Sequence, residues 1–152
     1  MVDITEISAM VAAAGVMIGV VYYILEIRHQ TKAKQMDLIV RLQSMYVDSV
    51  LQSNETLRKT ETKNYKDFQE KCSMQAQDVA GFFDNVGLLL RRGLIDIDLI
   101  SQLFILEGVW KKLKPFVEGT RERTKEPRFY GNFEYLYNEW KKKEQKLQQS
   151  KA

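Results

Sequence analysis

The chain begins with a long apolar stretch, and no residue from Ile7 to Leu25 is charged. As an α-helix this stretch would be about 28 Å long at about 1.5 Å per residue, close to the ~30 Å hydrocarbon core of a bilayer. Tyr22 and Tyr23 lie near its end, where amphipathic rings favour the membrane interface. The pattern predicts a transmembrane helix in a lipid bilayer, with residues 1–27 as an N-terminal membrane anchor.

The apolar stretch has two other interpretations, a cleaved signal peptide and a buried helix of a globular protein. A cleaved signal peptide has a basic start and small residues after its apolar core. Here Asp3 and Glu6 make the start acidic, and the alanines at 12–14 come before the most apolar part. A buried helix of a globular protein is the other interpretation, although apolar runs of that kind usually have about 10–14 residues. Length and residue order favour a spanning helix.

The charges on either side of this stretch predict its orientation. Arg28, Lys32, Lys34 and Arg41 follow it, and no Lys or Arg precedes it. Basic residues near a span stay on the cytoplasmic side of the membrane. We therefore expect a single-pass protein of the cell membrane, with its N-terminus outside and the following domain in the cytoplasm.

Small residues recur at helical spacing within the predicted span. Gly15 and Gly19 form a G-x-x-x-G pair, and Ser8 and Ala12 extend the same face. Such a face lets the backbone of a second helix approach closely. The alternative is that Gly and Ala are simply frequent in membrane helices. The four residues are a candidate helix-packing face.

Apolar side chains at three- and four-residue steps continue after the anchor and indicate further helices. Neither Gly nor Pro occurs between Gly19 and Gly81, so the first helix is expected to extend from about residue 5 to 52. Gly93 and Asp96 are expected to end one helix and to cap the next. Further helices are expected over about residues 65–92, 97–114 and 129–147, with connections at 53–64 and 125–127. Pro115 is expected either to break the third helix or to kink it, with the helix then continuing from Phe116 to Arg123.

No alternating strand pattern competes with these helices. The predicted fold class is all-α, with one N-terminal transmembrane helix continuing into a small helical bundle of about four helices. Residues 28–148 are expected to form a cytoplasmic helical domain, and residues 149–152 a polar tail. The apolar stripes of the third and last helices include Trp110 and Trp140, which we expect in the core.

The composition limits the chemical functions that the chain can have. Of the 152 residues, 45% are hydrophobic and 28% charged, which is typical of a folded protein, and the net charge of +3 does not by itself indicate a nucleic-acid partner. The single histidine, His29, and the single cysteine, Cys72, are too few for a zinc site or a disulfide. Cys72 lies on the apolar face of its predicted helix, where we expect a packed hydrophobe. We expect no enzyme, no catalytic or metal-ligating residue and no cofactor.

Charged side chains near the end of the predicted second helix are the remaining candidates for a site. Arg91 and Arg92 complement the dipole of that helix, or they form a docking site for an acidic peptide or lipid head group. Asp84, Asp96 and Asp98 are the nearest carboxylates. Asp96 is explained as a helix cap and Asp98 as a first-turn charge, so neither requires a ligand.

Lysines cluster beside both tryptophans, at 111, 112 and 114 and again at 141–143. Basic residues interleaved with aromatic rings can bind single-stranded nucleic acid. Since both tryptophans are expected in the core, we interpret the lysines as solvated helix faces, or as contacts to anionic lipid. A nucleic-acid partner is not expected.

The segment from Gly81 to Asp96, with its paired Gly-Phe-Phe-Asp and Leu-Leu-Arg-Arg-Gly stretches, resembles a known pattern. Trp110, Arg121 and the stretch Phe133–Leu136 continue it. Together they resemble the domain of unknown function 4760, an uncharacterised prokaryotic, archaeal-type family of membrane-anchored proteins. The resemblance covers nearly the whole chain. It implies membrane location and an all-α domain, and it brings no catalytic residue with it.

These observations lead to two hypotheses about function. The first is a membrane-tethered helical module that binds protein, either itself or another membrane protein. The alternative is a small single-span accessory subunit of a larger membrane complex, which packs on other spans through Gly15 and Gly19. A stoichiometric polytopic partner in mild detergent would favour the second hypothesis.

Overall fold

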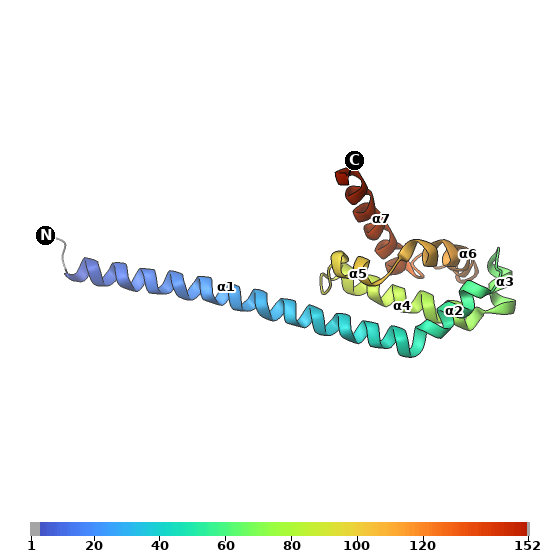
Figure 1. Ribbon diagram of the computed structural model, residues 1–152, viewed down its shortest axis with the longest axis horizontal. Helices are drawn as coiled ribbons and strands as arrows, with labels where there is room; N and C mark the ends of the chain where they lie inside the picture. Colours follow the sequence, from blue (N-terminus) through green and yellow to red (C-terminus); the bar gives the residue numbers. More distant parts are fainter. Residues whose placement is uncertain (1–3, 152) are drawn as a thin grey trace. The chain divides into compact units, whose positions relative to one another are not determined.

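The computed structural model describes residues 4–151, with side chains described over 15–150. Over this part the chain forms helices and no strand, which confirms the all-α prediction. Figure 1 shows the helices in chain order: α1 (Ile4–Met45), the π-helical turn η1 (Tyr46–Val50), α2 (Leu51–Lys59), α3 (Tyr65–Lys71), α4 (Ser73–Arg91), α5 (Ile97–Leu103), α6 (Leu106–Thr124) and α7 (Gly131–Lys151).

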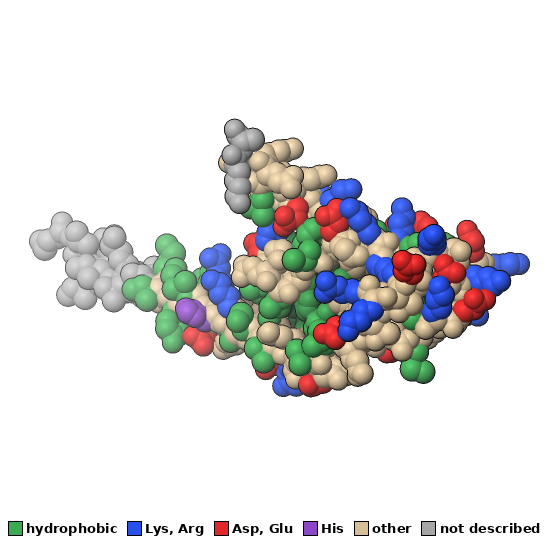
Figure 2. All heavy atoms as spheres, turned by 45° about the vertical axis from the view of Figure 1, so that its right-hand side comes forward, with side chains coloured by type: hydrophobic (Ala, Val, Ile, Leu, Met, Phe, Trp, Pro, Cys, Tyr) green, Lys and Arg blue, Asp and Glu red, His purple; other side chains and the backbone are tan. Residues whose placement is uncertain are grey.

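The chain divides into an N-terminal unit, Met1–Asp37, and a C-terminal unit, Leu38–Ala152. The N-terminal unit contains the first part of α1. Every described side chain from Gly15 to Lys34 is exposed, and Figure 2 shows apolar side chains standing out along this part of the helix.

The predicted span, Ile7–Leu25, lies only partly among the described residues, because the side chains of residues 7–14 are outside them. Among the residues that the structure describes, no helix has both the length and the apolar character needed to cross a membrane.

The first helical segment continues further than the sequence predicts. The end at residue 52 is wrong, since η1 leads directly into α2 and the helical course ends at Lys59. Leu57, which is only 1% exposed, explains the extension because its burial holds this otherwise polar turn against the core. The connection therefore covers residues 60–64 only.

The predicted second helix is two helices that meet at Cys72. Asn64 begins α3 by accepting a hydrogen bond from the Asp67 N–H at 3.0 Å. Cys72, with φ −158° and ψ 40°, ends α3 and begins α4. Its side chain is 2% exposed, which confirms the prediction of a packed residue, and burial raises the pKa of its thiol. The bend at Cys72 lets both α3 and α4 bury their apolar faces.

Gly93 ends α4 as predicted. With φ +68° it adopts the left-handed conformation that glycine accepts most readily. Its N–H donates to Leu90 O at 2.9 Å and the Leu94 N–H donates to Leu89 O at 3.0 Å, the hydrogen-bond pair of a Schellman motif. Asp96 is the N-cap residue of α5, as predicted, although its side chain makes no capping hydrogen bond.

Of the two expectations for Pro115, a break is wrong, whereas the continuation of the helix to Arg123 is confirmed. α5 ends at Leu103, the extended residues Phe104 and Ile105 follow, and Pro115 lies inside α6. A proline removes one backbone hydrogen bond from a helix interior. Here the fully or nearly fully buried residues on both sides of it, Leu113 and Phe116, hold the two halves of α6 in one core. The third predicted helix is thus α5 and most of α6, and the C-terminal unit has more helices than the predicted bundle of four.

The last helix begins two residues later than predicted, at Gly131, after Tyr130 in a left-handed conformation with φ +53°. Phe133 and Leu136 are fully buried, as their stripe predicts, whereas Phe129 is 42% exposed and lies outside the helix. Trp110 and Trp140 are 6% and 9% exposed, which confirms that both belong to the core.

α4 is the central helix of the C-terminal unit, since it contacts η1, α2, α3, α6 and α7. Its closest approach is to α7. A Cβ atom added at Gly87 would lie 2.0 Å from the backbone oxygen of Asn132, so only glycine allows the two helices this separation. Phe83, one turn earlier on α4, stacks on Phe133 of α7 with 5.4 Å between the ring centroids.

Candidate functional site

A groove of about 600 Å³ lies in the C-terminal unit between η1–α2 and the α5–α6 junction. We call it the α2–α6 groove. Concave sites of this size with mostly apolar walls and a few polar groups are where proteins commonly bind ligands or partner side chains. The apolar part of its lining consists of Leu57, Phe83, Leu103, Phe104, Ile105, Gly108, Val109 and Leu113, and the polar part of Tyr46, Asn54, Arg58 and Lys112.

The π-helical turn places two polar residues on the groove side of the chain. The Leu51 N–H donates to Tyr46 O, a five-residue spacing that inserts one residue into the helix. At about 100° per residue, positions 46 and 54 would be about 80° apart on an uninterrupted α-helix. The inserted residue brings them onto one face, where Asn54 Nδ2 donates to the Tyr46 hydroxyl at 2.8 Å.

The opposite wall is formed where α5 ends and α6 begins. Phe104 is half-buried, and its ring packs edge-on against Tyr46 with 5.2 Å between the centroids. Ile105, next to it, is 81% exposed at the rim. Gly108 follows on the first turn of α6, and a Cβ atom added there would meet no atom within 4 Å. The wall therefore ends in an open apolar edge.

The charge of the groove has one sign. Among the described residues that line it, Arg58 and Lys112 are cationic and none is acidic. Lys112 Nζ donates to the backbone oxygen of Thr60, so this ammonium is used to hold the end of α2. Over the part of the chain that the structure describes, Arg58 makes no ion pair or hydrogen bond. The guanidinium of Arg58 therefore has N–H donors that are free to bind a partner.

Of the polar residues that line the groove, only Lys112 stands out in the sequence, as part of the lysine cluster beside Trp110. The π-turn has no local sequence signature, and the groove lies between segments some fifty positions apart in the chain. Gly108 was the one available signal, because a glycine inside an expected helix often has a packing or functional reason. Tyr46, Asn54 and Arg58 could be assigned to a site only after folding brought them opposite Gly108.

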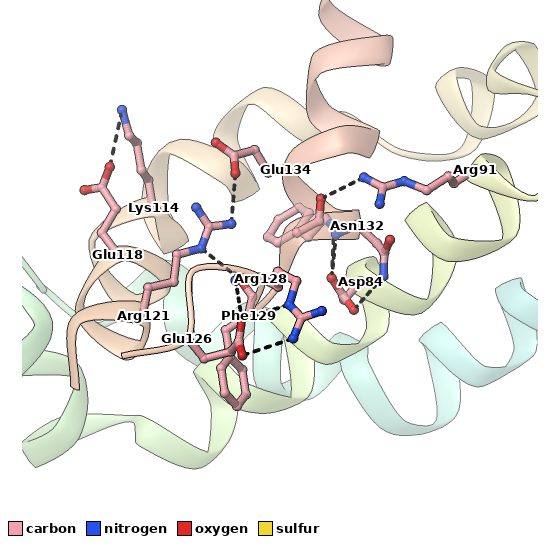
Figure 3. A network of polar contacts seen from close by, with 12 residues as sticks. Asp84, Arg91, Lys114, Glu118, Arg121, Glu126, Arg128, Phe129, Asn132 and Glu134 are labelled. Atoms are coloured by element: carbon pink, nitrogen blue, oxygen red, sulfur yellow. Dashed lines mark hydrogen bonds and ion pairs between the residues drawn. The ribbon is translucent and has the colours of Figure 1, made fainter. Parts of the chain in front are cut away.

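The candidate docking pair, Arg91 and Arg92, lies at the exposed end of α4, away from the groove lining. Arg91 is engaged with α7: its guanidinium lies 4.6 Å above the Tyr135 ring and donates to Gly131 O at 3.5 Å. Figure 3 shows Arg91 reaching toward the start of α7. These contacts give Arg91 a role in helix packing, while Arg92 is exposed at the C-cap position.

Of the candidate helix-packing face, the structure describes two members. Gly15 and Gly19 are exposed on α1, and a Cβ atom added at either would meet no atom within 4 Å. The side chains of Ser8 and Ala12 lie outside the described residues. The described half of the face is open to a second helix.

The carboxylates of Asp84, Asp96 and Asp98 lie at separate positions. Asp84 accepts hydrogen bonds from the N–H groups of Asn132 at 2.9 Å and Phe133 at 3.1 Å, at the start of α7 (Figure 3). First-turn N–H groups have no partner within their own helix, so a side chain of α4 caps α7 here. Asp98 pairs with Lys143 at 2.6 Å, and Asp96 is at the N-cap of α5. The trio does not converge on one point.

Replacing Asp84 by alanine is expected to lower the free energy of unfolding by about 1–3 kcal/mol, because two first-turn N–H groups of α7 lose their acceptor. Asp84→Asn keeps one carbonyl acceptor and should cost less. Denaturant unfolding followed by tryptophan fluorescence measures both, since Trp110 and Trp140 lie in the C-terminal unit. Equal stability of the wild type and D84A would show that water caps α7 equally well.

The lysines beside the tryptophans are mostly paired on helix surfaces. Lys111 bonds to Glu107 at 2.7 Å, and this hydrogen bond lowers the pKa of the Glu107 carboxyl and raises that of the Lys111 ammonium. Lys142 pairs with Glu139 at 2.6 Å. Figure 2 shows acidic side chains interspersed with the basic ones on the face it presents. With both tryptophans buried, this surface does not have the exposed rings that stack on unpaired bases.

The fold and site define an all-helical protein whose C-terminal unit bears an apolar groove with a cationic rim. The model of the family described as Domain of unknown function (DUF4760) matches residues 9–140. The chain therefore belongs to this family, as the helix punctuation and aromatic spacing indicated. No curated protein and no solved structure matches the chain.

Proposed function

We propose that this chain is a membrane-tethered helical module that binds a protein partner through the α2–α6 groove. The observation that carries the proposal is the groove itself, with about 600 Å³ of space, apolar walls and free donors at its rim. Binding energy at protein interfaces is concentrated where an anchor side chain fills such a pocket. Arg91 and the lysines 111, 142 and 143 have partners within the fold, which makes the groove the better-supported site for recognition.

The tether is inferred from the N-terminal unit. The uncharged stretch Ile7–Leu25 has the length of a bilayer span. Its described apolar members stand exposed, for example Met17 at 73% and Ile18 at 70%. Such side chains are stable when lipid or another apolar surface covers them. The basic residues after the stretch orient the C-terminal unit toward the cytoplasm, and the membrane-anchored, archaeal-type layout that the family resemblance implies supports the same arrangement.

Crosslinking in intact cells followed by purification of the full-length chain tests the groove as the binding site. Gly108→Leu should fill it, because the added Cβ meets no atom within 4 Å and the rest of the side chain extends from there. We expect a protein captured stoichiometrically by the wild type to be lost with G108L. Gly81→Leu is the matched control, since Gly81 is also helical, also has open space at its Cβ and does not line the groove. Capture that is unchanged in G108L would contradict the proposal.

A second function is supported by the open face of Gly15 and Gly19. Small residues at this spacing let two membrane helices pack at short distance, as in an accessory subunit of a larger membrane complex.

Replacing both Gly15 and Gly19 by isoleucine is expected to dissociate any complex that forms through this face, because four-carbon side chains keep the helix backbones apart. Size-exclusion chromatography with light scattering in mild detergent measures the change. A stoichiometric polytopic partner lost in the double variant would favour the accessory-subunit role. An unchanged complex size would show that Gly15 and Gly19 do not mediate helix packing, and the groove would remain the proposed site of interaction.

A further inference from the structure

We propose that the α2–α6 groove recognises a segment of the partner protein that presents a large apolar side chain and, within about one helical turn of it, a carboxylate. This inference rests on the proposed function and adds the chemistry of the partner to it. It follows from three features of the groove: its apolar depth, its polar pair and its unpaired cation.

The depth of the groove suits an apolar anchor. Its floor contains Leu57, Phe83 and Leu113, which are at most 1% exposed and hold the walls in place from the core side. A volume of about 600 Å³ accommodates one or two large side chains of a partner. Burial of such a side chain is favourable enough to anchor a segment without a large interface.

Tyr46 and Asn54 form the polar pair of the groove, and they fix the orientation of a bound segment. The Tyr46 hydroxyl accepts a hydrogen bond from the Asn54 amide, which leaves the hydroxyl proton and the Asn54 carbonyl for other partners. One group thus donates and the neighbouring one accepts. This combination matches the C=O and N–H groups of a polypeptide backbone, whereas an acyl chain would leave both unsatisfied.

The cation determines the charge of the partner. Arg58 lies one helical turn beyond Asn54 on α2, at the rim of the groove, and presents donors in a planar fork. A carboxylate accepts two parallel hydrogen bonds from this fork, which gives both strength and geometry. Lys112 adds positive charge nearby while it holds Thr60 O. No acidic residue lines the described groove, and Glu55 lines only the neighbouring hollow that it shares with Arg58 and Lys59.

Ile105 favours a protein over a small amphiphile as the occupant. Its side chain is 81% exposed at the rim, where it extends the apolar surface beyond the groove. A single acyl chain that fills the groove would leave this side chain in water. A partner segment with residues on both sides of its anchor would cover it.

Selection from a random peptide display library on the immobilised full-length chain tests the inference. The wild type should enrich peptides with an aromatic or aliphatic residue and an Asp or Glu three or four positions away. With Arg58→Glu, the enriched peptides should bind at least about tenfold more weakly, and reselection should favour Lys or Arg instead, because reversing one member of a charge pair replaces attraction by repulsion. Lys59→Glu is the matched control: it makes the same change in net charge on the adjacent residue, which does not line the groove.

Each other outcome overturns the inference. Acidic peptides that bind R58E and K59E equally well would show a general charge effect and not recognition by Arg58. Enrichment of peptides without an acidic residue would contradict the proposed partner chemistry. So would a result in which every enriched peptide still binds the G108L variant. Sodium decanoate is the lipid-like probe. If it binds the wild type but not R58E or G108L, and no peptide binds, the groove is a site for lipid. The cellular capture experiment distinguishes failure of the proposed function from failure of this inference. A partner that is lost with G108L but retained with R58E would support binding in the groove and would contradict the requirement for a carboxylate at Arg58.

Discussion

Replacing Trp110 by alanine is expected to lower the free energy of unfolding by about 3–5 kcal/mol, the usual cost of removing a buried tryptophan. Its ring meets Phe133 edge-on with 4.9 Å between the centroids and stacks on Tyr137 at 5.4 Å. All the contacts that the ring makes with α7 are lost in the alanine variant, and the cavity cannot close without moving α6. A loss of this size is a large part of the stability of a typical domain.

The remaining tryptophan reports the transition. Trp140 also lies in the C-terminal unit, so denaturant unfolding of W110A can be followed by its fluorescence. Phe129→Ala is a suitable control, because Phe129 is 42% exposed and its ring removal should cost much less. A midpoint for W110A that equals that of the wild type would place Trp110 on the surface and would reopen binding to unpaired bases.

Gly87→Ala is expected to have the second largest effect. The added methyl group would lie 2.0 Å from the carbonyl oxygen and 2.5 Å from the carbonyl carbon of Asn132, and both are backbone atoms that no rotamer change can move away. α4 and α7 must separate to accept it. Separation also lengthens the two hydrogen bonds from the start of α7 to Asp84. Overpacking of this kind costs about 1–3 kcal/mol, and here the lost cap adds to it.

Gly81→Ala provides a comparison within the same helix. Gly81 also lies in α4, but an added Cβ atom meets no atom within 4 Å there. Helix propensity alone then predicts a gain of about 0.5–1 kcal/mol for G81A. The opposite signs of G81A and G87A in denaturant unfolding would establish the close contact of α4 and α7. A gain in both variants would show that the two helices are not in contact at Gly87.

Much of the helical course could be predicted from the sequence. The stop at Gly93, the cap position of Asp96 and the core stripe of Phe133, Leu136 and Trp140 depend on local conformational preference and on the period of the apolar residues. These are properties of consecutive residues, so they can be recognised before the fold is known. The prediction of an all-α fold rested on the same signals.

The errors came from positions where tertiary packing outweighs local preference. Pro115 normally interrupts a helix, yet buried residues on both sides keep α6 intact. The polar turn of α2 stays helical because Leu57 is buried. The bend at Cys72 has no glycine or proline to announce it. In each case the deciding contact is with a residue distant in the chain.

The candidate site was the least predictable part. Arg91, which stood out as a charged residue at a helix end, contacts Tyr135 of α7 within the fold. The α2–α6 groove depends on the inserted residue of η1, which rotates Asn54 toward Tyr46. A single inserted residue in a helix has no recognisable pattern in the sequence, so only the structure locates it.

We propose that the N-terminal unit tethers the chain to the membrane with the C-terminal unit in the cytoplasm, and trypsin digestion of membrane vesicles tests this topology most directly. The extended connection after α2 is the expected first cut, since Lys59 and Lys63 are both exposed at its ends. Arg123 and Lys125 at the end of α6 are also exposed, whereas Arg121 is half-buried and paired with Glu134 at 2.8 Å. These sites should be cut in inside-out vesicles, leaving a membrane-bound fragment from the N-terminal end of the chain, and protected in right-side-out vesicles. Cutting in right-side-out vesicles, or release of the uncut chain from the membranes by an alkaline wash, would contradict the account.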